Sequence, residues 1–453
     1  MRVAIIGGGI SGLAAAHALG TSHPDADIVV LEGSDRIGGK LRLGKIGGFT
    51  VDLGAESILA RRPEGIALIA AAGLSDRLVH PATMTAGIWT HGAVRPMPPT
   101  VMGIPADLDA LEATGIIVER PRSVAIPRPA ADMAVADFIA ERVGSDIVDR
   151  LVEPLLGGVY AGHASELSLD AAAPQIAALG DDLLAGATKA RAAAVDSGPV
   201  FAGLIGGIGQ LPEAVARASG AEIRTNATVR QLTRTADGWE LLVGPTSAVE
   251  VIHADAVIMA APAPAAARLL ADVAPNAAFA LAAIDYASMA VLTFAVSRSA
   301  FTQAPEGSGF LVPPIDGKAI KAVTYSSNKW AWVGREAGEE TIILRCSIGR
   351  AHEAALLQGD DAELIDLALS DLGEAVGLTG DPIDAGVTRW GGGLPQYTVG
   401  HLSRIATIDA DIATVAGLEV CGAAYRGVGI PAVIASAQVA AARLISDLGK
   451  MKL

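Results

Sequence analysis

The stretch VAIIGGGISGLAAAHALG (residues 3–20), followed by DIVVLE (residues 27–32), decides the first part of the fold. Its apolar start predicts a buried parallel strand, and its alanine- and leucine-rich end predicts a helix. Between them the glycines have G-x-G-x-x-G spacing, and the second strand ends at Glu32, twenty residues after the last glycine of the motif. This order of strand, glycine turn, helix, strand and acid predicts a β-α-β unit that binds a dinucleotide.

Each residue of the motif has a separate physical task. Gly7 permits the tight turn, Gly9 lets the backbone approach a pyrophosphate, and Gly12 lets the helix pack closely on the strand. The helix N-terminus then offers free N–H groups to the phosphates. Glu32 can accept hydrogen bonds from ribose hydroxyls, and its charge would repel the 2′-phosphate of NADP.

The next segment, GSDRIGGKLRL (residues 33–43), distinguishes FAD from NAD. Its paired Gly38 and Gly39 resemble the second glycine doublet of FAD-dependent amine oxidases, phytoene desaturases and protoporphyrinogen oxidases. Such a pair lets the backbone turn beneath the flavin side of an extended cofactor, and NAD dehydrogenases do not usually carry it. An ordinary loop is the alternative interpretation.

Composition limits the class of protein. The chain has 453 residues, of which 51% are apolar and 18% charged, so we expect two or three folded domains. A net charge of −15 argues against a nucleic-acid surface, and an anionic substrate would need a local basic patch. Cys346 and Cys421 give no disulfide framework, which fits a reducing cytoplasm.

The mean hydropathy of +0.43 comes largely from alanine. We find no charge-free run of the ~18 apolar residues that a membrane span needs, so no transmembrane segment is expected. Peripheral membrane contact stays open. The N-terminus mimics a signal peptide, but the strand-turn-helix pattern explains it better.

The rest of the chain divides by pattern. The pattern predicts a strand and turn at 49–58, a helix at 63–78 and a proline-rich loop at 96–129. It predicts amphipathic helices over 131–194, with breaks at Pro154 and Gly157–Gly158. A strand-rich substrate sheet is predicted over 281–350, and a helix over 361–376. We predict an α/β fold with an FAD-binding Rossmann-like domain of the amine-oxidase/glutathione-reductase type, an α+β substrate domain and an inserted helical domain. The FAD-binding domain comprises 1–60, 200–265 and 385–453, the substrate domain 61–95 and 266–384, and the helical domain 96–199.

Four blocks carry a more specific resemblance. They are EPLLGGVYAGHASELSLDAAAP (153–174), GSGFLVP (307–313), RWGGGLPQYTVGH (389–401) and GAAYRGVGIPAVIAS (422–436). In this order they resemble the oxygen-dependent protoporphyrinogen/coproporphyrinogen III oxidases, and the soluble Gram-positive bacterial type most closely. The resemblance implies non-covalent FAD and oxidation of coproporphyrinogen III by O2 in haem biosynthesis, with H2O2 as a product. It implies that flavin N5 carries the chemistry, and we identify no catalytic side chain and no metal-ligand spacing.

The motifs and the resemblance together indicate a set of contacts. Cofactor contacts are expected at Gly7, Gly9, Ile10, Ser11, Gly12, Glu32, Gly33, Arg36, Gly39, Lys40, Leu41, Gly54, Ala55, Glu56, Ser57, Val229, Trp390, Gly422, Val428, Gly429 and Ile430. Substrate contacts are expected at Arg62, Gly158, Phe310 and Leu311, with Arg62 binding a propionate. The alternatives are a helix-capping role for Arg62, core packing for Phe310 and Leu311, and a core role for Trp390. His163 lies beside a substrate-side block, with a structural role as its alternative.

Three other functions stay open at this point. One is protoporphyrinogen IX oxidation. Another is a different FAD enzyme, either an amine oxidase, in which Cys421 would be a candidate for covalent attachment, or a carotenoid desaturase. The third is a non-enzymatic prenyl-GTPase escort protein, against which the retained flavin motifs argue. We expect a cytoplasmic protein without nucleic-acid partners. We add a transient ferrochelatase contact to the expected partners and predict no particular oligomeric state.

Overall fold

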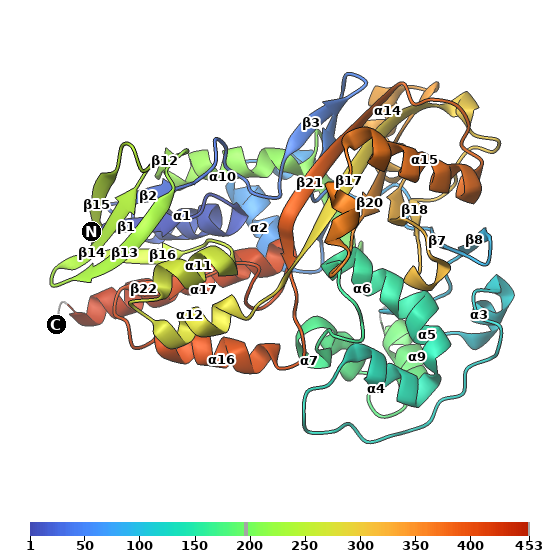
Figure 1. Ribbon diagram of the computed structural model, residues 1–453, viewed down its shortest axis with the longest axis horizontal. Coiled ribbons are helices and arrows are strands. Elements are labelled where there is room, and N and C mark those ends of the chain that lie inside the picture. The colour runs from blue at the N-terminus through green and yellow to red at the C-terminus, as the bar shows by residue number, and fades with distance from the viewer. Residues whose placement is uncertain (194–197, 452–453) are drawn as a thin grey trace.

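A computed structural model describes residues 1–193 and 198–451. The predicted helical stretch ends at residue 194, and the predicted FAD-binding part ends with residues 452 and 453; these three positions lie outside the described residues. One lobe contains a parallel sheet with its helices, and the other contains a larger sheet above a group of helices (Figure 1).

The first lobe is built on a five-stranded parallel sheet of order β12-β2-β1-β16-β22. Its strands are β1 (Arg2–Ile6), β2 (Asp27–Leu31), β12 (Glu222–Arg224), β16 (Ala256–Met259) and β22 (Leu418–Val420). Segments from three distant parts of the sequence therefore share one sheet. The predicted strand-turn-helix is confirmed, with α1 spanning Ile10–Ser22.

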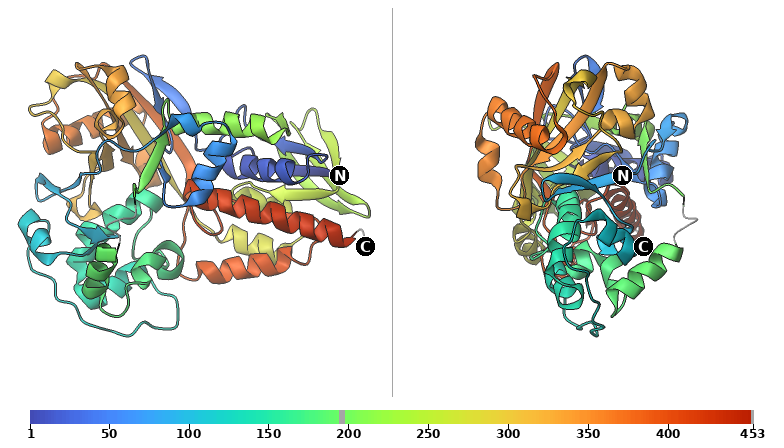
Figure 2. Two further views of the ribbon diagram at one scale, coloured as in Figure 1. Left: turned by 180° about the vertical axis from the view of Figure 1, so that it is seen from behind. Right: turned by 90° about the vertical axis from the view of Figure 1, so that its right-hand side faces the viewer.

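The two faces of β1 differ in what covers them. Val3 and Ile5 pack in a core formed by four helices, whereas Ala4 and Ile6 pack in a core formed by a three-stranded antiparallel sheet and three helices. The first group contains α1, α2 (Pro63–Ala71), α10 (Leu211–Ser219) and α17 (Ile430–Met451); the second contains β13 (Val229–Thr235), β14 (Gly238–Val243), β15 (Glu250–Ala254), α11 (Ala263–Leu270), α12 (Pro275–Ala282) and α16 (His401–Ile412). Seen from behind, α17 runs beside α1 (Figure 2).

The second lobe contains a seven-stranded sheet of order β21-β17-β20-β19-β18-β7-β8. The strands are β7 (Ala86–Thr90), β8 (Ala93–Pro96), β17 (Tyr286–Ser297), β18 (Gly309–Leu311), β19 (Ile320–Thr324), β20 (Thr341–Ile348) and β21 (Asp384–Pro395). One face is covered by α15 (Asp361–Val376), whose bounds match the predicted helix because Asp360 and Glu363 form a capping box. β21 pairs with β17 over most of its length, although the predicted boundary at 385 assigned it to the FAD-binding part.

The helical group has its own core around Phe138, Leu151 and Leu156. It comprises α3 (Leu108–Thr114), α4 (Val135–Val143), α5 (Ser145–Ile147), a π-helical turn (Val148–Val152), α6 (Glu153–Tyr160), α7 (Leu169–Ala172), α8 (Pro174–Ala177) and α9 (Leu183–Ala193).

Three local predictions in or beside this group were wrong. The helix is not broken at Pro154, because this proline occupies the first turn of α6, where its missing N–H costs little. It is not broken at Gly157–Gly158 either, because both glycines lie within α6. The predicted loop 96–129 contains α3, which Asp107 caps through its side chain. The helix predicted over 63–78 ends at Ala71.

The chain also contains shorter elements. They are the hairpin β3 (Leu43–Ile46) and β4 (Phe49–Asp52), the strands β5 (Ile58–Leu59), β6 (Leu78–Val79) and β11 (Phe201–Leu204), the pair β9 (Thr100–Val101) and β10 (Ile104–Pro105), and the helices α13 (Ser326–Lys329) and α14 (Ala331–Ala337).

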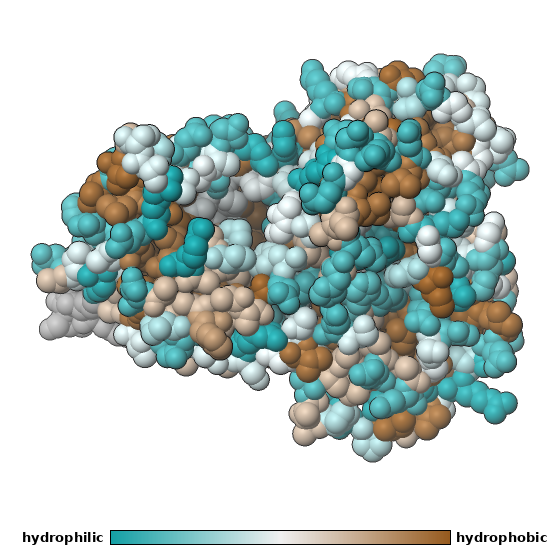
Figure 3. Space-filling view, in the orientation of Figure 1, coloured by the Kyte–Doolittle hydropathy of each residue, from teal (hydrophilic) through white to brown (hydrophobic). Residues whose placement is uncertain are grey.

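Among the described residues, one helix has the length and composition of a membrane span, at Ile430–Leu448 in α17. Its Ile434, Ala437 and Leu444 are buried in the core that α17 shares with α1. Hydrophilic and hydrophobic side chains are interspersed over the face shown in Figure 3.

Candidate functional site

The loop between β1 and α1 has the geometry of a phosphate-binding turn. Gly7 has φ +112°, and a Cβ there would lie 2.9 Å from the carbonyl oxygen of Ala260, while a Cβ at Gly12 would collide with the Gly7 oxygen. Gly9 precedes α1 without any side-chain cap, and no described atom lies within 4 Å of where its Cβ would be. The N–H groups of Ile10, Ser11 and Gly12 at the first turn thus face space that an anion can fill.

Glu32 is fixed at the end of β2. Its Oε2 accepts the Gly8 N–H at 2.7 Å, and its Oε1 accepts the Ser34 N–H and hydroxyl at 2.8 Å each. The Ala227 N–H bonds to the Glu32 carbonyl, which brings the start of β13, and with it Val229, beside this acid and Gly33. The predicted adenosine-side residues therefore lie together.

The second glycine pair lies directly beside the first glycine loop. The Gly38 N–H donates to the Gly8 carbonyl at 2.8 Å, and Gly39 approaches Gly9. The Arg36 guanidinium donates to the Gly39 carbonyl at 2.9 Å, which fixes the turn. This adjacency brings together parts of the predicted cofactor set that are separated in sequence.

Trp390 joins the two lobes at this place. Its Nε1 donates to the Leu53 carbonyl at 3.1 Å, the Arg36 guanidinium lies 5.9 Å from its ring centre, and a Cβ at Gly54 would lie 3.1 Å from its ring. Lys40 reaches solvent, but protein surrounds most of its ammonium group, and this desolvation lowers the pKa of Lys40. These residues, with Leu41 and Ala55 next in sequence, therefore lie close together where the two lobes meet.

Glu56, a predicted cofactor contact, is held by two cations. Its carboxylate pairs with the Lys329 ammonium at 2.5 Å and the Arg345 guanidinium at 3.0 Å, and all three side chains are 11–15% exposed. Burial alone would raise the pKa of Glu56, but these two cations lower it to about 2. Arg345 also donates to the Gly54 carbonyl, so the Gly54–Ser57 segment is held by its own ion cluster.

The seven-stranded sheet presents a half-buried face opposite the one that α15 covers. Side chains alternate along the strands, so partners across the sheet share one face. The half-buried side chains on this face are Leu311, Ala322, Thr324, Arg345, Ser347 and Trp390. Helix α6 contacts β18 and β19, and a Cβ at Gly158 would meet only Leu311, at 3.9 Å. The structure thus brings Gly158 and Leu311 together, on the same sheet face as Trp390.

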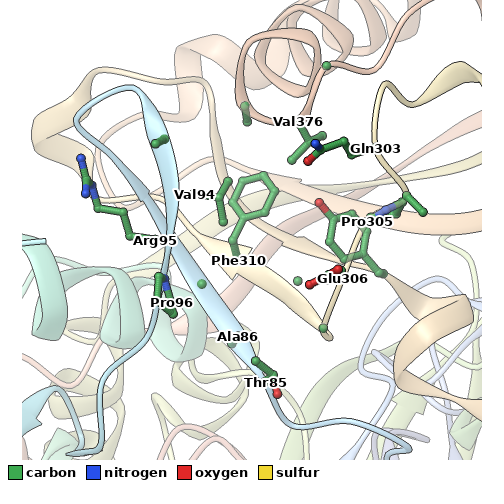
Figure 4. Close-up of a pocket in the computed structure, with 18 of the residues that line it drawn as sticks. Thr85, Ala86, Val94, Arg95, Pro96, Gln303, Pro305, Glu306, Phe310 and Val376 are labelled. Atoms are coloured by element: carbon green, nitrogen blue, oxygen red, sulfur yellow. The ribbon is translucent and has the colours of Figure 1, made fainter. Parts of the chain in front are cut away.

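Phe310, predicted to contact the substrate with Leu311, points to the opposite face. It is 2% exposed and packs edge-on against Trp89 and Tyr325. The reason is the two-residue period of a strand, which sends neighbours to opposite faces. A cavity of about 1130 Å³ borders Phe310 on this far side, between the β7–β8 hairpin and residues 302–307 (Figure 4).

The C-terminal glycine loop meets the start of α1. Gly422 has φ +129°, and a Cβ there would lie 3.5 Å from the Ser11 hydroxyl. The neighbouring Cys421 thiol is fully buried, which raises its pKa to about 12. Further along, Val428 is half-buried, and Gly429 is exposed just before α17 begins at Ile430. The glycine loops near the two ends of the chain thus lie side by side.

Arg62, the predicted propionate contact, already has an acidic partner within the chain. The Arg62 guanidinium pairs with Glu64 at 2.8 Å, which raises the Arg62 pKa. His163 bonds to Glu153 at 3.0 Å and to the Ala351 carbonyl at 3.2 Å, so it joins α6 to the segment after β20. A substrate carboxylate would have to compete with Glu64 for Arg62, and a propionate contact there stays a prediction.

Sequence reasoning missed Lys329, Arg345, Tyr397 and His401. Lys329 and Arg345 have no local signal, because their partner Glu56 is over 270 positions away. Tyr397 and His401 lie in the block RWGGGLPQYTVGH, which could have indicated them. Their contacts with the C-terminal loop appear only in the tertiary structure.

Comparisons with known proteins agree with this geometry. Residues 10–445 match the family described as flavin containing amine oxidoreductase. The coproporphyrinogen III oxidase of Mycobacterium leprae is 38% identical over 98% of each chain, and that of Bacillus subtilis is 30% identical over 95% of each. A crystal structure from Exiguobacterium sp. 255-15 has a TM-score of 0.85 at 31% identity over 98% of both chains. The cyclohexylamine oxidase of Brevibacterium oxydans IH-35A, at 19% identity, 99% coverage of both chains and a TM-score of 0.70, shares the fold. The chain belongs to the flavin-containing amine oxidoreductase family.

Proposed function

We propose that this protein is an FAD-dependent oxidase that converts coproporphyrinogen III to coproporphyrin III with O2 as the acceptor. The observation that carries the proposal is the position of Trp390, which joins the flavin-binding segments to the half-buried sheet face beneath α6. Relatives that match over nearly the whole chain are named coproporphyrinogen III oxidases.

The chain's residues fit FAD. The uncapped N-terminus of α1 and the open space at Gly9 suit the diphosphate, and Glu32 suits the adenosine ribose. The loop at Gly429 is open toward the flavin side, because no described atom lies within 4 Å of where a Cβ would be. When bound, FAD supplies two-electron acceptor chemistry, so the six-hydrogen oxidation of a porphyrinogen requires three turnovers.

The remaining residues bind and orient the macrocycle. The small Gly158 and the apolar Leu311 form a surface on which a pyrrole face can lie. Because the chain carries a net charge of −15, the four propionates need local cations, and Arg62 is the predicted one. No side-chain nucleophile is needed for this reaction.

The neighbouring function is protoporphyrinogen IX oxidation. The chloroplastic protoporphyrinogen oxidase 1 of Arabidopsis thaliana is 27% identical over 92% of this chain. The two substrates differ in propionate number, so the basic groups near the site decide between them. A cytoplasmic location stays a prediction, as do a transient ferrochelatase contact and any peripheral contact with a membrane.

The test compares both porphyrinogens in air by the appearance of porphyrin fluorescence. We expect a yellow protein that oxidises coproporphyrinogen III faster than protoporphyrinogen IX. A clear preference for protoporphyrinogen IX would reassign the substrate. A yellow protein that oxidises neither would overturn the proposed function and leave a flavin oxidase of another substrate.

A further inference from the structure

Tyr397 lies between β21 and α16 and touches no residue of the predicted substrate set. Its side chain is 1% exposed, and its hydroxyl bridges two backbone groups of the C-terminal glycine loop. The hydroxyl donates to the Ala423 carbonyl at 2.6 Å and accepts the Gly427 N–H at 2.7 Å. One phenol therefore ties together two points that are four residues apart in an irregular loop.

His401 braces this phenol. Its ring stacks on the Tyr397 ring with centroids 3.9 Å apart and planes 15° apart. Burial lowers the His401 pKa to about 4, so the ring is neutral near pH 7. Its Nε2 lies 2.9 Å from the Tyr425 carbonyl oxygen and donates to it, because a carbonyl oxygen only accepts, and Nδ1 has no partner among the described residues. The two rings hold the carbonyls of Ala423 and Tyr425 and the Gly427 N–H.

Tyr397 is also held by contacts outside the loop. The Tyr397 backbone carbonyl accepts the Ser168 N–H at 2.7 Å, which connects this residue to the helical group. Its ring also contacts Tyr160 at the end of α6, with centroids 5.5 Å apart. The phenol therefore projects from a packed base toward a loop that has no sheet pairing of its own.

The loop that Tyr397 holds carries the C-terminal part of the predicted flavin contacts. It begins at Gly422, beside the Ser11 hydroxyl, and ends at Gly429, before α17. Gly427 has φ +127°, a conformation that residues with a side chain rarely adopt, so the loop needs glycine at this position. The direction of the α17 N-terminus follows from this shape, and a helix N-terminus stabilises negative charge nearby.

We propose that Tyr397, braced by His401, is a positioning residue that sets the Gly422–Gly429 loop against the flavin. The inference rests on the proposed function only for the presence of FAD. Replacing the phenol by a phenyl ring leaves the Ala423 carbonyl and the Gly427 N–H without their partner, and buried unpaired groups are costly. The loop would then relax, and FAD would be held less tightly.

The test is Tyr397→Phe in the FAD-loaded protein, with FAD dissociation followed by flavin fluorescence and the bound flavin followed by its visible spectrum. We expect the Kd for FAD to rise about tenfold or more, as two lost hydrogen bonds allow, with a changed spectrum of the bound flavin. The matched control is Tyr160→Phe, which removes a hydroxyl bonded to the Ala172 carbonyl at 3.4 Å in the same buried cluster. This control should leave the Kd and the spectrum unchanged.

A wild-type Kd in Tyr397→Phe, or an equal rise in Tyr160→Phe, would overturn the inference. If Tyr397→Phe does not fold, His401→Phe takes its place, because it keeps the stacked ring and loses the bond to the Tyr425 carbonyl. It should raise the Kd in the same direction, and an unchanged Kd would count against the bracing role. No porphyrinogen is needed, so a wrong substrate cannot produce these results, whereas a wild-type protein without flavin would contradict the proposed function itself.

Discussion

Replacing Glu56 by glutamine tests whether the ion cluster beside the predicted flavin segment stabilises the fold. Glutamine keeps the shape of the side chain and removes its charge, which leaves Lys329 and Arg345 without their counter-ion in a largely buried place. A pKa difference of one between the folded and unfolded states corresponds to a free-energy difference of about 1.4 kcal/mol. The fall of the Glu56 pKa from 4.5 to about 2 therefore corresponds to about 3 kcal/mol at pH 7. This agrees with the roughly 3–5 kcal/mol lost when one partner of a buried pair is removed.

The pH dependence has a definite sign. Because the folded state lowers the pKa of Glu56, its stabilisation is fully present above the unfolded value of 4.5 and is lost as the pH falls toward 2. The stability gap between wild type and Glu56→Gln should therefore shrink from about 3 kcal/mol at pH 7 to about 2 kcal/mol at pH 3.5.

The assay is urea unfolding of the FAD-loaded protein, followed by tryptophan fluorescence at both pH values. Glu64→Gln is the control, because its pair with Arg62 is exposed and should contribute less than about 1 kcal/mol. Equal stability of wild type and Glu56→Gln at pH 7 would refute the reasoning, as would a loss of the same size in Glu64→Gln.

Three further predictions concern the site. Gly158→Leu should lower kcat/KM for coproporphyrinogen III at least tenfold, because the leucine side chain fills the space beside Leu311. The control Gly157→Ala, in the same helix, should leave kcat/KM unchanged. Wild-type kinetics in Gly158→Leu would show that α6 is not part of the substrate surface. Arg62→Ala should raise KM more for the four-propionate than for the two-propionate substrate, and equal changes would leave Arg62 only its pair with Glu64. Acid denaturation should release all FAD, because the Cys421 thiol is buried; a mass increase of the denatured chain would contradict this.

Local patterns predicted the nucleotide-binding part well. The glycine spacing before α1 and the acid after β2 concern residues within one β-α-β unit, where sequence distance and spatial distance are nearly the same. The capping box at Asp360 likewise fixed the start of α15. Predictions that relied on breakers failed at Pro154, because a proline in the first helical turn does not break a helix.

By itself, the sequence determined the dinucleotide loop, the acid that closes it and the second glycine pair, since backbone conformation at glycine and strand-helix spacing are local properties. Only the tertiary structure decided that Leu311 and not Phe310 faces Gly158, that Glu56 pairs with Lys329 and Arg345, and that Tyr397 holds the last glycine loop. The physical reason is that these contacts join residues far apart in the chain. Which face of a strand is buried, and which charges meet, depends on how the lobes pack and not on neighbouring residues.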